Sequence, residues 1–156
     1  MVPDVDRAIL DPLARLGESA TSITDVVLTH HHPDHTLNAG LFPMALTHDH
    51  WATYQGDRWE DHARHVFQVS SSILMAATPG HTPQDVTVLA GTDLPDRGRL
   101  IVALTHLWWR ADGPVEDPYA TDPEDLHRHR RSILAIAGLI VPGHGPPFVP
   151  DARTPR

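Results

Sequence analysis

Short apolar runs rich in β-branched residues recur along the chain, and each run predicts a strand. The runs lie at residues 23–29, 66–69, 73–78, 85–90, 99–104 and 139–141, with a further short strand expected at 44–47. Apolar residues at helical spacing occur in two segments, residues 6–16 and 123–137. This alternation of strands with a few helices predicts one domain of mixed α/β type.

The ends of the two predicted helices carry suitable capping residues. Gly17 is placed to end the first helix. Thr121 or Asp122 can cap the second helix, and Pro123 suits its first turn. Both segments are therefore expected to begin and end close to the limits that their apolar spacing indicates.

The remaining polar segments predict loops. Residues 48–65 are polar and irregular, and we expect a long functional loop there. Residues 91–98 are expected to form a turn between two strands. The predicted domain covers residues 1–149, and residues 150–156 are expected to be a flexible tail.

Composition narrows the function classes. The chain has 156 residues, 40% of them hydrophobic, which is enough for one packed core. Its formal charge is -8, and an acidic chain is poorly suited to non-specific nucleic-acid binding. Cysteine is absent, which excludes disulfides, thiolate metal sites and cysteine nucleophiles. No apolar run approaches the ~18 residues of a membrane span. The acidic start of the chain is unlike a secretory signal, so we expect a cytoplasmic protein without a membrane partner.

Histidine is unusually frequent, with 13 residues, and it is concentrated at strand ends. Three predicted strands lead directly into tight turns that carry His30, His81 and His144. Ligands in α/β sheets gather at strand ends, and turns rich in glycine and proline hold side chains in fixed positions. Because thiolates are absent, histidine and carboxylates are the strong metal ligands that remain.

The first of these turns carries the most specific motif. His30-x-His32-x-Asp34-His35 places four potential ligands within six residues. Alternation along an extended segment points His30 and His32 the same way, and the following turn can direct Asp34 and His35 to a second point. One loop could thus serve two metals ~3.5–4 Å apart, the usual spacing in two-metal hydrolases. The alternative is a solvated polar turn.

This motif, preceded by a buried strand, resembles the signature of the metallo-β-lactamase superfamily. The segments 78–82 (TPGHT) and 141–146 (VPGHGP) resemble the later histidine motifs of that superfamily, in the same order. Further segments are similar to the metallo-β-lactamase domain-containing protein 1 group, namely residues 38–43, 85–88 and 141–148. The resemblance covers residues 5–148 and implies the αβ/βα sandwich of the superfamily.

The resemblance also implies site residues and a reaction. His30, His32 and His81 would hold one zinc ion, and Asp34, His35 and His144 a second metal. Asp34 would in addition act in catalysis by orienting the attacking water. A zinc-bound hydroxide would be the nucleophile, because zinc lowers the pKa of its water to ~7. One or two zinc ions per chain are expected, with iron or manganese as alternatives.

The sequence departs from the superfamily pattern in two places. His106 lies where an aspartate usually bridges two metals, and an imidazole has only one lone pair to offer. We therefore expect a weaker second metal or a one-metal site. His106 would then be a ligand, an outer hydrogen-bond donor or displaced from the site, with Asp93 and Asp112 as substitutes. Only 29 residues precede His30, so strands of the first half-sheet are expected to be missing, and a homo-oligomer or a partner chain would cover exposed edges.

The sequence also suggests a role or a position for His50, Trp108 and His31. His50 is a candidate substrate contact, with a surface loop as the alternative. Trp108 is a candidate pocket wall, with a place in the core as the alternative. His31 lies between two predicted ligands and is expected to point away from the metal.

The function expected from these features is metal-dependent hydrolysis of a small molecule. The bond attacked would be an ester, lactone, thioester, amide or phosphodiester. One alternative is a metal-dependent endoribonuclease, which the acidic charge disfavours. The other is a non-catalytic, metal-binding remnant of the fold.

Overall fold

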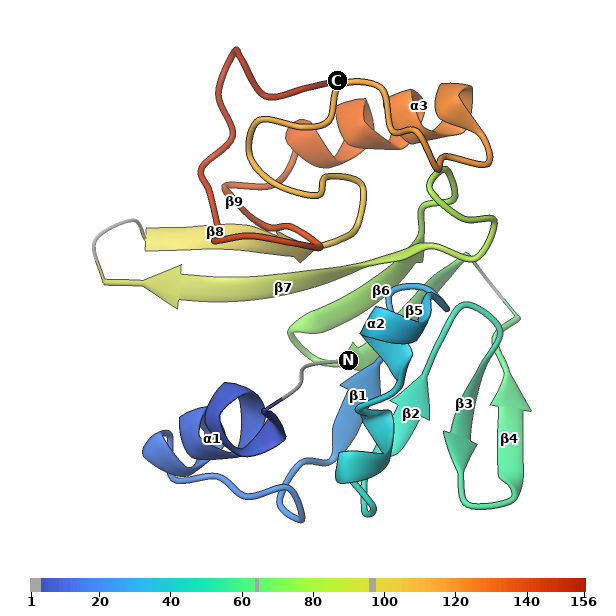
Figure 1. Cartoon of the computed structure of the whole chain (residues 1–156), viewed down its shortest axis with the longest axis vertical. Helices are drawn as coiled ribbons and strands as arrows, with labels where there is room; N and C mark the ends of the chain where they lie inside the picture. Colours follow the sequence, from blue (N-terminus) through green and yellow to red (C-terminus); the bar gives the residue numbers. More distant parts are fainter. Residues whose placement is uncertain (1–3, 64, 96–97) are drawn as a thin grey trace. The chain divides into compact units, whose positions relative to one another are not determined.

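A computed structural model of the chain describes residues 4–63, 65–95 and 98–156. Contacts within the chain divide it into two compact units, Met1–His62 and Ala63–Arg156. We expected one domain over residues 1–149. Each of the two units has a sheet of its own (Figure 1).

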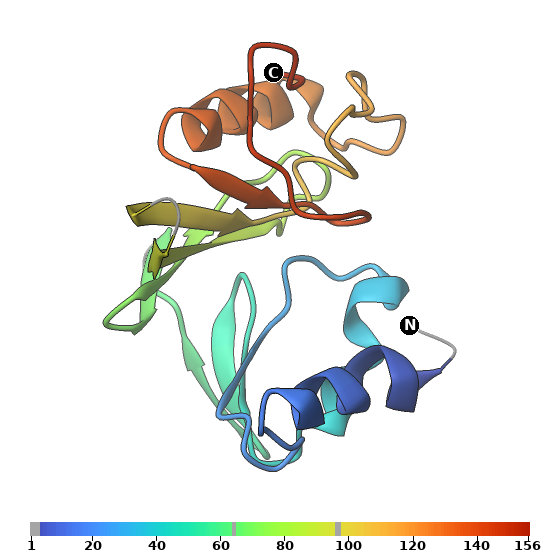
Figure 2. The ribbon, with the colours of Figure 1, turned by 90° about the vertical axis from the view of Figure 1, so that its left-hand side faces the viewer.

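The first unit is built on a four-stranded sheet in the order β1-β2-β3-β4. Its strands are β1 (Asp25–Val27), β2 (Leu46–His48), β3 (Ala52–Gln55) and β4 (Arg58–Asp61). β1 pairs with β2 in parallel, and the other pairs are antiparallel. The helical segments α1 (Asp11–Arg15) and α2 (Pro33–Thr36) lie on one face of this sheet (Figure 2). A 3-10 turn at Ala39–Leu41 follows α2.

The helix predicted over residues 6–16 is present in two pieces. A π-helical turn at Asp6–Leu10 leads directly into α1. Pro12 therefore falls in the first turn of α1, a position where proline is common. Gly17 follows with a φ of 81°, the left-handed conformation that commonly ends a helix.

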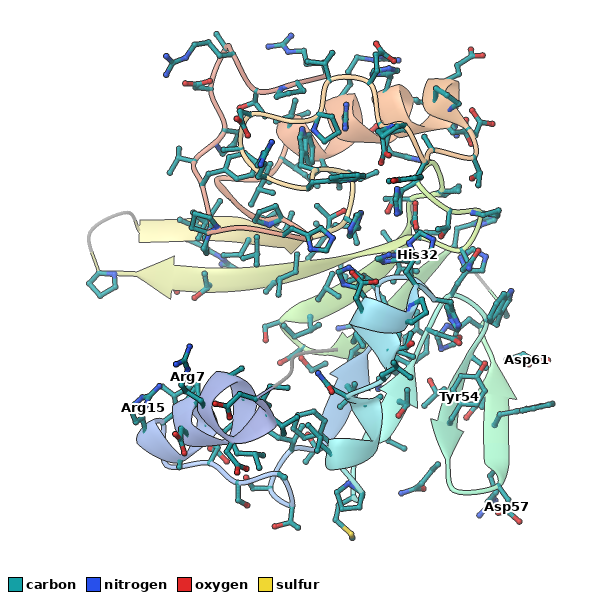
Figure 3. All side chains as sticks on the ribbon, in the orientation of Figure 1. Arg7, Arg15, His32, Tyr54, Asp57 and Asp61 are labelled. Carbon is teal, nitrogen blue, oxygen red and sulfur yellow. The ribbon has the colours of Figure 1, made fainter. Side chains whose placement is uncertain are left out.

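The prediction of a long loop over residues 48–65 is wrong. The segment contains the antiparallel hairpin of β3 and β4, with Tyr54 opposite Trp59 in the register. Gly56, with a φ of 62°, forms the turn. Figure 3 labels Tyr54 on β3, Asp57 in the turn and Asp61 at the end of β4. Every residue of β4 is exposed, so the strand shows none of the apolar alternation that identifies a half-buried strand.

The second unit is built on a five-stranded sheet in the order β5-β6-β7-β8-β9. Its strands are β5 (Val66–Ser70), β6 (Ile73–Ala77), β7 (Val86–Leu94), β8 (Gly98–Leu104) and β9 (Leu139–Val141). Neighbouring strands are antiparallel except β9, which pairs with β8 in parallel. The turn expected over residues 91–98 is wrong for its first part, because β7 continues through Gly91 and Asp93 pairs with Arg99. Residues 96–97 lie outside the described residues.

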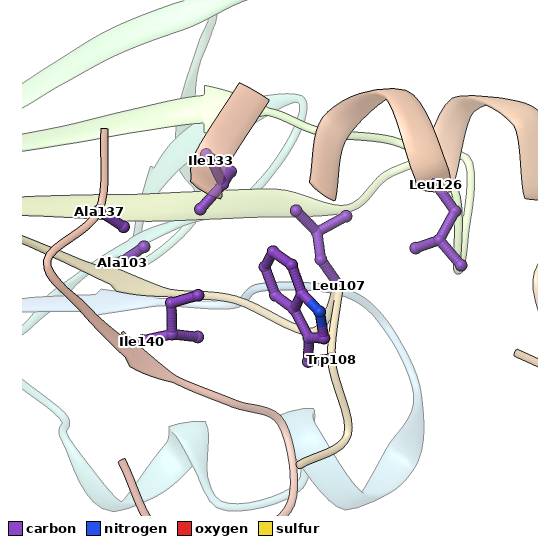
Figure 4. Packing of buried hydrophobic residues seen from close by; sticks show 7 residues of the cluster. All are labelled: Ala103, Leu107, Trp108, Leu126, Ile133, Ala137 and Ile140. Carbon is purple, nitrogen blue, oxygen red and sulfur yellow. The ribbon is translucent and has the colours of Figure 1, made fainter. Parts of the chain in front are cut away.

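Helix α3 (Pro123–Leu134) covers one face of this sheet (Figure 2). Its N-cap is Asp122, which accepts a hydrogen bond from the backbone N–H of Asp125 at 2.9 Å. The core beneath α3 is formed by Ala103, Leu107, Trp108, Leu126, Ile133, Ala137 and Ile140 (Figure 4). Within the described residues no helix is long and apolar enough to cross a membrane.

The end of the chain contacts this core, although a flexible tail was expected over residues 150–156. Thr154 and Pro155 are buried, and the Trp108 Nε1–H donates to the Pro155 carbonyl at 2.8 Å. Trp108 itself is 0% exposed. It is therefore a core residue, and its prediction as a pocket wall is wrong because both its ring and its polar atom are already occupied.

Candidate functional site

The candidate metal ligands follow strand ends in both units. The first unit carries His30, His32, Asp34 and His35, and the second carries His81, His106 and His144. Each residue offers one imidazole nitrogen or carboxylate oxygen as a ligand atom. Hydrogen bonds within each unit hold the loops that carry these ligands.

In the first unit, the loop after β1 brings its histidines together. The Nε2 of His30 lies 3.1 Å from the Nδ1 of His32. His32 is the last extended residue before α2, with a ψ of 142°, and Figure 3 labels it at this point. The single turn of α2 then returns His35 to His30, with ring centroids 4.3 Å apart. Asp34 is more exposed, and its Oδ2 lies 3.3 Å from the Nε2 of His35.

His31 points to a different partner, as expected for a residue between two ligands. Its Nε2 lies 3.2 Å from the Oδ2 of Asp49, and its ring lies 4.8 Å from that of Trp51. Asp49 is buried and also accepts from the backbone N–H groups of Trp51 and Ala52. This contact ties the histidine loop to the turn between β2 and β3. His50 lies in the same turn, half-buried, with its ring 6.1 Å from Trp51.

A further series of side-chain contacts in the first unit joins Asp25, His48, Thr53 and His62. The Oδ1 of Asp25 lies 2.8 Å from the Nε2 of His48, whose Nδ1 lies 2.9 Å from the Thr53 hydroxyl. The hydroxyl in turn lies 3.0 Å from the Nε2 of His62. Burial tends to raise the pKa of Asp25, but the hydrogen bonds from His48 and Thr24 and the charge of His48 outweigh it and lower this pKa. These contacts connect the strands β1, β2 and β3 of the first unit.

In the second unit, three strands deliver their histidines to one cluster. His81 follows β6, His106 follows β8 and His144 follows β9. The rings of His81 and His106 are stacked with centroids 4.3 Å apart, and the rings of His106 and His144 are perpendicular at 5.1 Å. His81 and His106 are buried, whereas His144 is exposed. The strand ends that carry them therefore converge within this unit.

Buried hydroxyls tie these strand ends together. The Thr87 hydroxyl lies 2.8 Å from that of Thr78 and 2.8 Å from that of Thr105. Asp85 closes the turn of His81 by accepting from the backbone N–H and the hydroxyl of Thr82. Burial raises the pKa of Asp85 to about 6, against the opposing effect of these hydrogen bonds.

Two glycines are required by close contacts at this cluster. A Cβ on Gly143 would lie 2.2 Å from the Cδ2 of His106, so only glycine leaves room for this imidazole. A Cβ on Gly80 would lie 2.6 Å from the Cα of Leu126, in the first turns of α3. The glycines of both histidine turns thus let a side chain or a helix approach the backbone directly.

Sequence reasoning missed Asp117, a buried carboxylate in the loop after β8. Its Oδ2 accepts from the Nδ1–H of His81 at 2.7 Å and from the Nε1–H of Trp109 at 3.1 Å. Its Oδ1 accepts from the backbone N–H of Tyr119 at 2.9 Å. Burial tends to raise the pKa of Asp117, but these hydrogen bonds and the charge of His81 outweigh it and lower this pKa. The separation of 36 residues from His81 leaves no local spacing that could have identified it.

The aspartates proposed as substitutes for a bridging ligand lie elsewhere. Asp112 is exposed and pairs with Arg110 at 2.9 Å. Asp93 is paired with Arg99 across β7 and β8. Neither belongs to the candidate ligand groups found among the described residues.

Trp109, the neighbour of Trp108, lies beside the histidine cluster. Its ring is 6.4 Å from His81, 6.4 Å from His106 and 6.2 Å from His144, edge-to-face in each case. Its other side is stacked on Tyr119, with centroids 5.7 Å apart and an interplanar angle of 6°. The indole beside the histidine cluster is therefore that of Trp109 and not that of Trp108.

The donor set of these loops fits a divalent metal. Imidazole nitrogens suit zinc and iron, and carboxylate oxygens add ligands for zinc, iron or manganese. Because the Nδ1 of His81 is bonded to Asp117, Nε2 is the atom that His81 would offer to a metal. The chemistry such a set supports is hydrolysis assisted by a Lewis acid.

Comparison with known sequences gives consistent matches. A sequence model of the family described as "Metallo-beta-lactamase superfamily" matches residues 2–146. The "Metallo-beta-lactamase domain-containing protein 1" of Xenopus laevis is 34% identical over 147 residues, covering 90% of this chain and 62% of the relative. The protein of the same name from Homo sapiens is 37% identical over 152 residues, covering 94% of this chain and 56% of the relative. The chain thus spans little more than half the length of these relatives.

Comparison with solved structures shows the fold. An N-acyl homoserine lactone hydrolase with N-hexanoyl-L-homoserine bound at its catalytic metal centre matches with a TM-score of 0.63 and 19% identity. The match covers 89% of this chain and 62% of that protein. The protein TTHA1623, solved in a di-iron-bound form, matches with a TM-score of 0.62 and 17% identity, covering 94% and 80%. The expected αβ/βα fold class is confirmed.

Proposed function

Because this chain belongs to the metallo-β-lactamase superfamily, whose members include metal-dependent hydrolases, we propose that it is itself a metal-dependent hydrolase of small molecules. The observation that carries the proposal is the set of histidine turns at strand ends, in the superfamily order, with His81 held so that its Nε2 is available.

The proposed ligands are those that the motifs indicate. In the order of the superfamily motifs, His30, His32 and His81 would hold one ion, and Asp34, His35 and His144 would hold a second where two are present. When bound, a divalent metal supplies a Lewis acid that polarises the scissile group and acidifies water. Zinc is the first candidate because of the histidine-rich donor set, and iron and manganese are the alternatives.

The protein groups then have separate tasks. The Asp34 carboxylate, which is exposed, orients the attacking water and accepts its proton at a carboxylate oxygen. The rings of Trp109 and Tyr119 provide an apolar wall against which a substrate group packs. His106 adds either a ligand atom or a hydrogen bond, but an imidazole cannot bridge two ions as a carboxylate can. We therefore propose one tightly held metal and a weaker second one.

Lactones and simple esters are the first substrates to test. The N-hexanoyl-L-homoserine bound in the structural neighbour is the product of that protein's lactone hydrolysis, and it supports a lactone as an initial probe here. The -8 charge argues against a nucleic-acid substrate, because phosphate binding depends on basic side chains. No membrane partner is proposed, and self-association of the chain remains part of the proposal.

A second candidate function is metal binding without catalysis. The observation that favours it is His106 at the position expected for a bridging aspartate, stacked on His81. If His106 completes a four-ligand shell, no position is left for water, as in structural zinc sites. Both functions predict a bound metal, but only the hydrolase predicts turnover of a substrate.

Hydrolysis assays on matched variants separate these candidates. The wild type is tested on p-nitrophenyl acetate and on an N-acyl homoserine lactone, with zinc, iron(II) or manganese added. His32→Ala should abolish both bound metal and turnover, whereas His65→Ala, which changes an exposed histidine outside the cluster, should leave both unchanged. If the wild type binds metal but turns over neither of these substrates, nor a thioester, amide or phosphodiester probe tested in the same way, the non-catalytic function is favoured. Unchanged turnover in His32→Ala would refute the proposed ligand set.

A further inference from the structure

Asp117 is a buried carboxylate that serves three N–H donors at once. Its side chain is 0% exposed, and both of its oxygens are used. One oxygen accepts from His81 and Trp109, and the other accepts from the backbone of Tyr119. A carboxylate removed from water is normally retained only where such bonds satisfy it. The three donors belong to a candidate metal ligand and to the two members of the aromatic wall.

The bond to Asp117 determines which nitrogen of His81 carries the proton. An ionised carboxylate only accepts hydrogen bonds, so the Nδ1 of His81, at 2.7 Å, must be the protonated nitrogen. In the neutral ring the lone pair is then on Nε2, which is the tautomer that a metal bound at Nε2 requires. Stacking on His106 further limits rotation of the His81 ring.

The same carboxylate oxygen holds the aromatic wall. The Nε1–H of Trp109 donates to the Oδ2 that also accepts from His81. The Oδ1 holds the backbone of Tyr119, whose ring stacks on Trp109. A change at this one carboxylate therefore reaches both the ligand and the wall beside it.

We propose that Asp117 is a positioning residue that holds His81 in the tautomer with Nε2 available and fixes Trp109 and Tyr119 beside it. Its effect on metal binding rests on the metal-dependent function proposed above, whereas its effect on the tautomer does not. Residues that hold a metal-binding histidine in this way typically change metal affinity by ~10–100-fold when they are replaced.

Asp117→Asn is the most direct substitution because it keeps the shape of the side chain. An amide offers one acceptor oxygen and one NH2 group in place of two acceptor oxygens. At least one of the three donors must then face the NH2 group of the new asparagine. Where that donor is the Nδ1–H of His81, the ring can relieve the clash by moving its proton to Nε2. Asp112→Asn is the matched control, because it neutralises an exposed carboxylate of the same loop.

The tautomer is read in metal-free protein labelled with 15N-histidine, by two-bond 15N–1H correlation at pH 8, with His81→Gln used to assign the signal. Wild type and Asp112→Asn should show His81 protonated at Nδ1, and Asp117→Asn should show an increased fraction protonated at Nε2. Zinc affinity, measured by competition with a chelating dye, should fall ~10–100-fold in Asp117→Asn and stay within twofold in the control. Trp109→Phe removes one donor only and should leave the tautomer unchanged.

Several outcomes would overturn the inference. His81 protonated at Nε2 in the wild type would do so whether or not the variant folds. A folded Asp117→Asn variant with the wild-type tautomer and zinc affinity would also do so. If the wild type shows the predicted tautomer but binds none of zinc, iron(II) and manganese, the proposed function fails while the positioning of His81 stands.

Discussion

Arg130 offers a sharp test of how the second unit holds its functional loop. Arg130 lies on α3 with its side chain fully buried, and burial lowers the pKa of its guanidinium. Its Nε donates to the Leu107 carbonyl at 2.8 Å, and its terminal nitrogens donate to the carbonyls of Val115 at 2.6 Å and Pro114 at 3.0 Å. The same side chain lies over Trp108, 5.8 Å from the ring centroid. One arginine thus attaches the loop after β8 to the helix.

The cost of replacing Arg130 with methionine follows from these contacts. Methionine retains most of the apolar stem but leaves three carbonyl oxygens without their donor. A buried polar group without a partner costs ~1–3 kcal/mol. The bond to Leu107 is buried, whereas those to Pro114 and Val115 are partly buried, so water can replace part of the latter two. We expect a loss of ~2–5 kcal/mol in the free energy of unfolding.

The assay is urea unfolding followed by circular dichroism, with linear extrapolation to water. Arg131→Met is the matched control, because it removes an exposed arginine from the next position of α3. The control should change the free energy of unfolding by no more than ~0.5 kcal/mol. If Arg130→Met costs no more than Arg131→Met, the three carbonyls have other partners and the reasoning is refuted.

Three further outcomes are expected. Gly143→Ala forces the His106 ring to move, since the new Cβ would lie 2.2 Å from it, and should lower bound metal per chain in elemental analysis. Gly40→Ala, where a Cβ meets open space, is its control, and equal metal in both variants would contradict the prediction. Asp25→Asn should lower the Tm at pH 7. The pKa of Asp25 in the folded protein is lowered by His48 and Thr24, so the ionised carboxylate stabilises the folded state. That difference should disappear as the pH falls below ~4, and a constant difference would exclude a role for the charge. Chelation of the metal should lower the Tm, with ~3 kcal/mol of stabilisation lost when free metal had stood at ~100 times its Kd, and an unchanged Tm would count against a bound ion.

Elements that bury an apolar face were predictable from the sequence. The strands β6 and β8 and the helix α3 lie where apolar spacing placed them, and Asp122 caps α3 as expected. The hairpin of β3 and β4 was missed because β4 is exposed at every residue and carries no periodic signal. Periodicity reports burial, and it fails where a strand buries nothing.

The site was predictable to the extent that its chemistry is local in sequence. The histidine motifs identified the superfamily, because each combines ligands with the turn residues that hold them. Asp117 was not predictable, since its contact with His81 depends on how the loop after β8 folds back. Likewise, only the hydrogen bonds of the two indoles distinguish Trp108, bonded to Pro155, from Trp109, bonded to Asp117.

The most direct test of metal dependence is the metal content of the wild-type chain, purified without added metal or chelator and measured by elemental mass spectrometry. We predict at least one zinc, iron or manganese ion per chain. It also predicts that His32→Ala and His81→Ala each lose this ion, while His65→Ala keeps it. A folded wild-type protein with no bound metal, or variants at His32 and His81 that retain the full metal content, would contradict the proposed metal site.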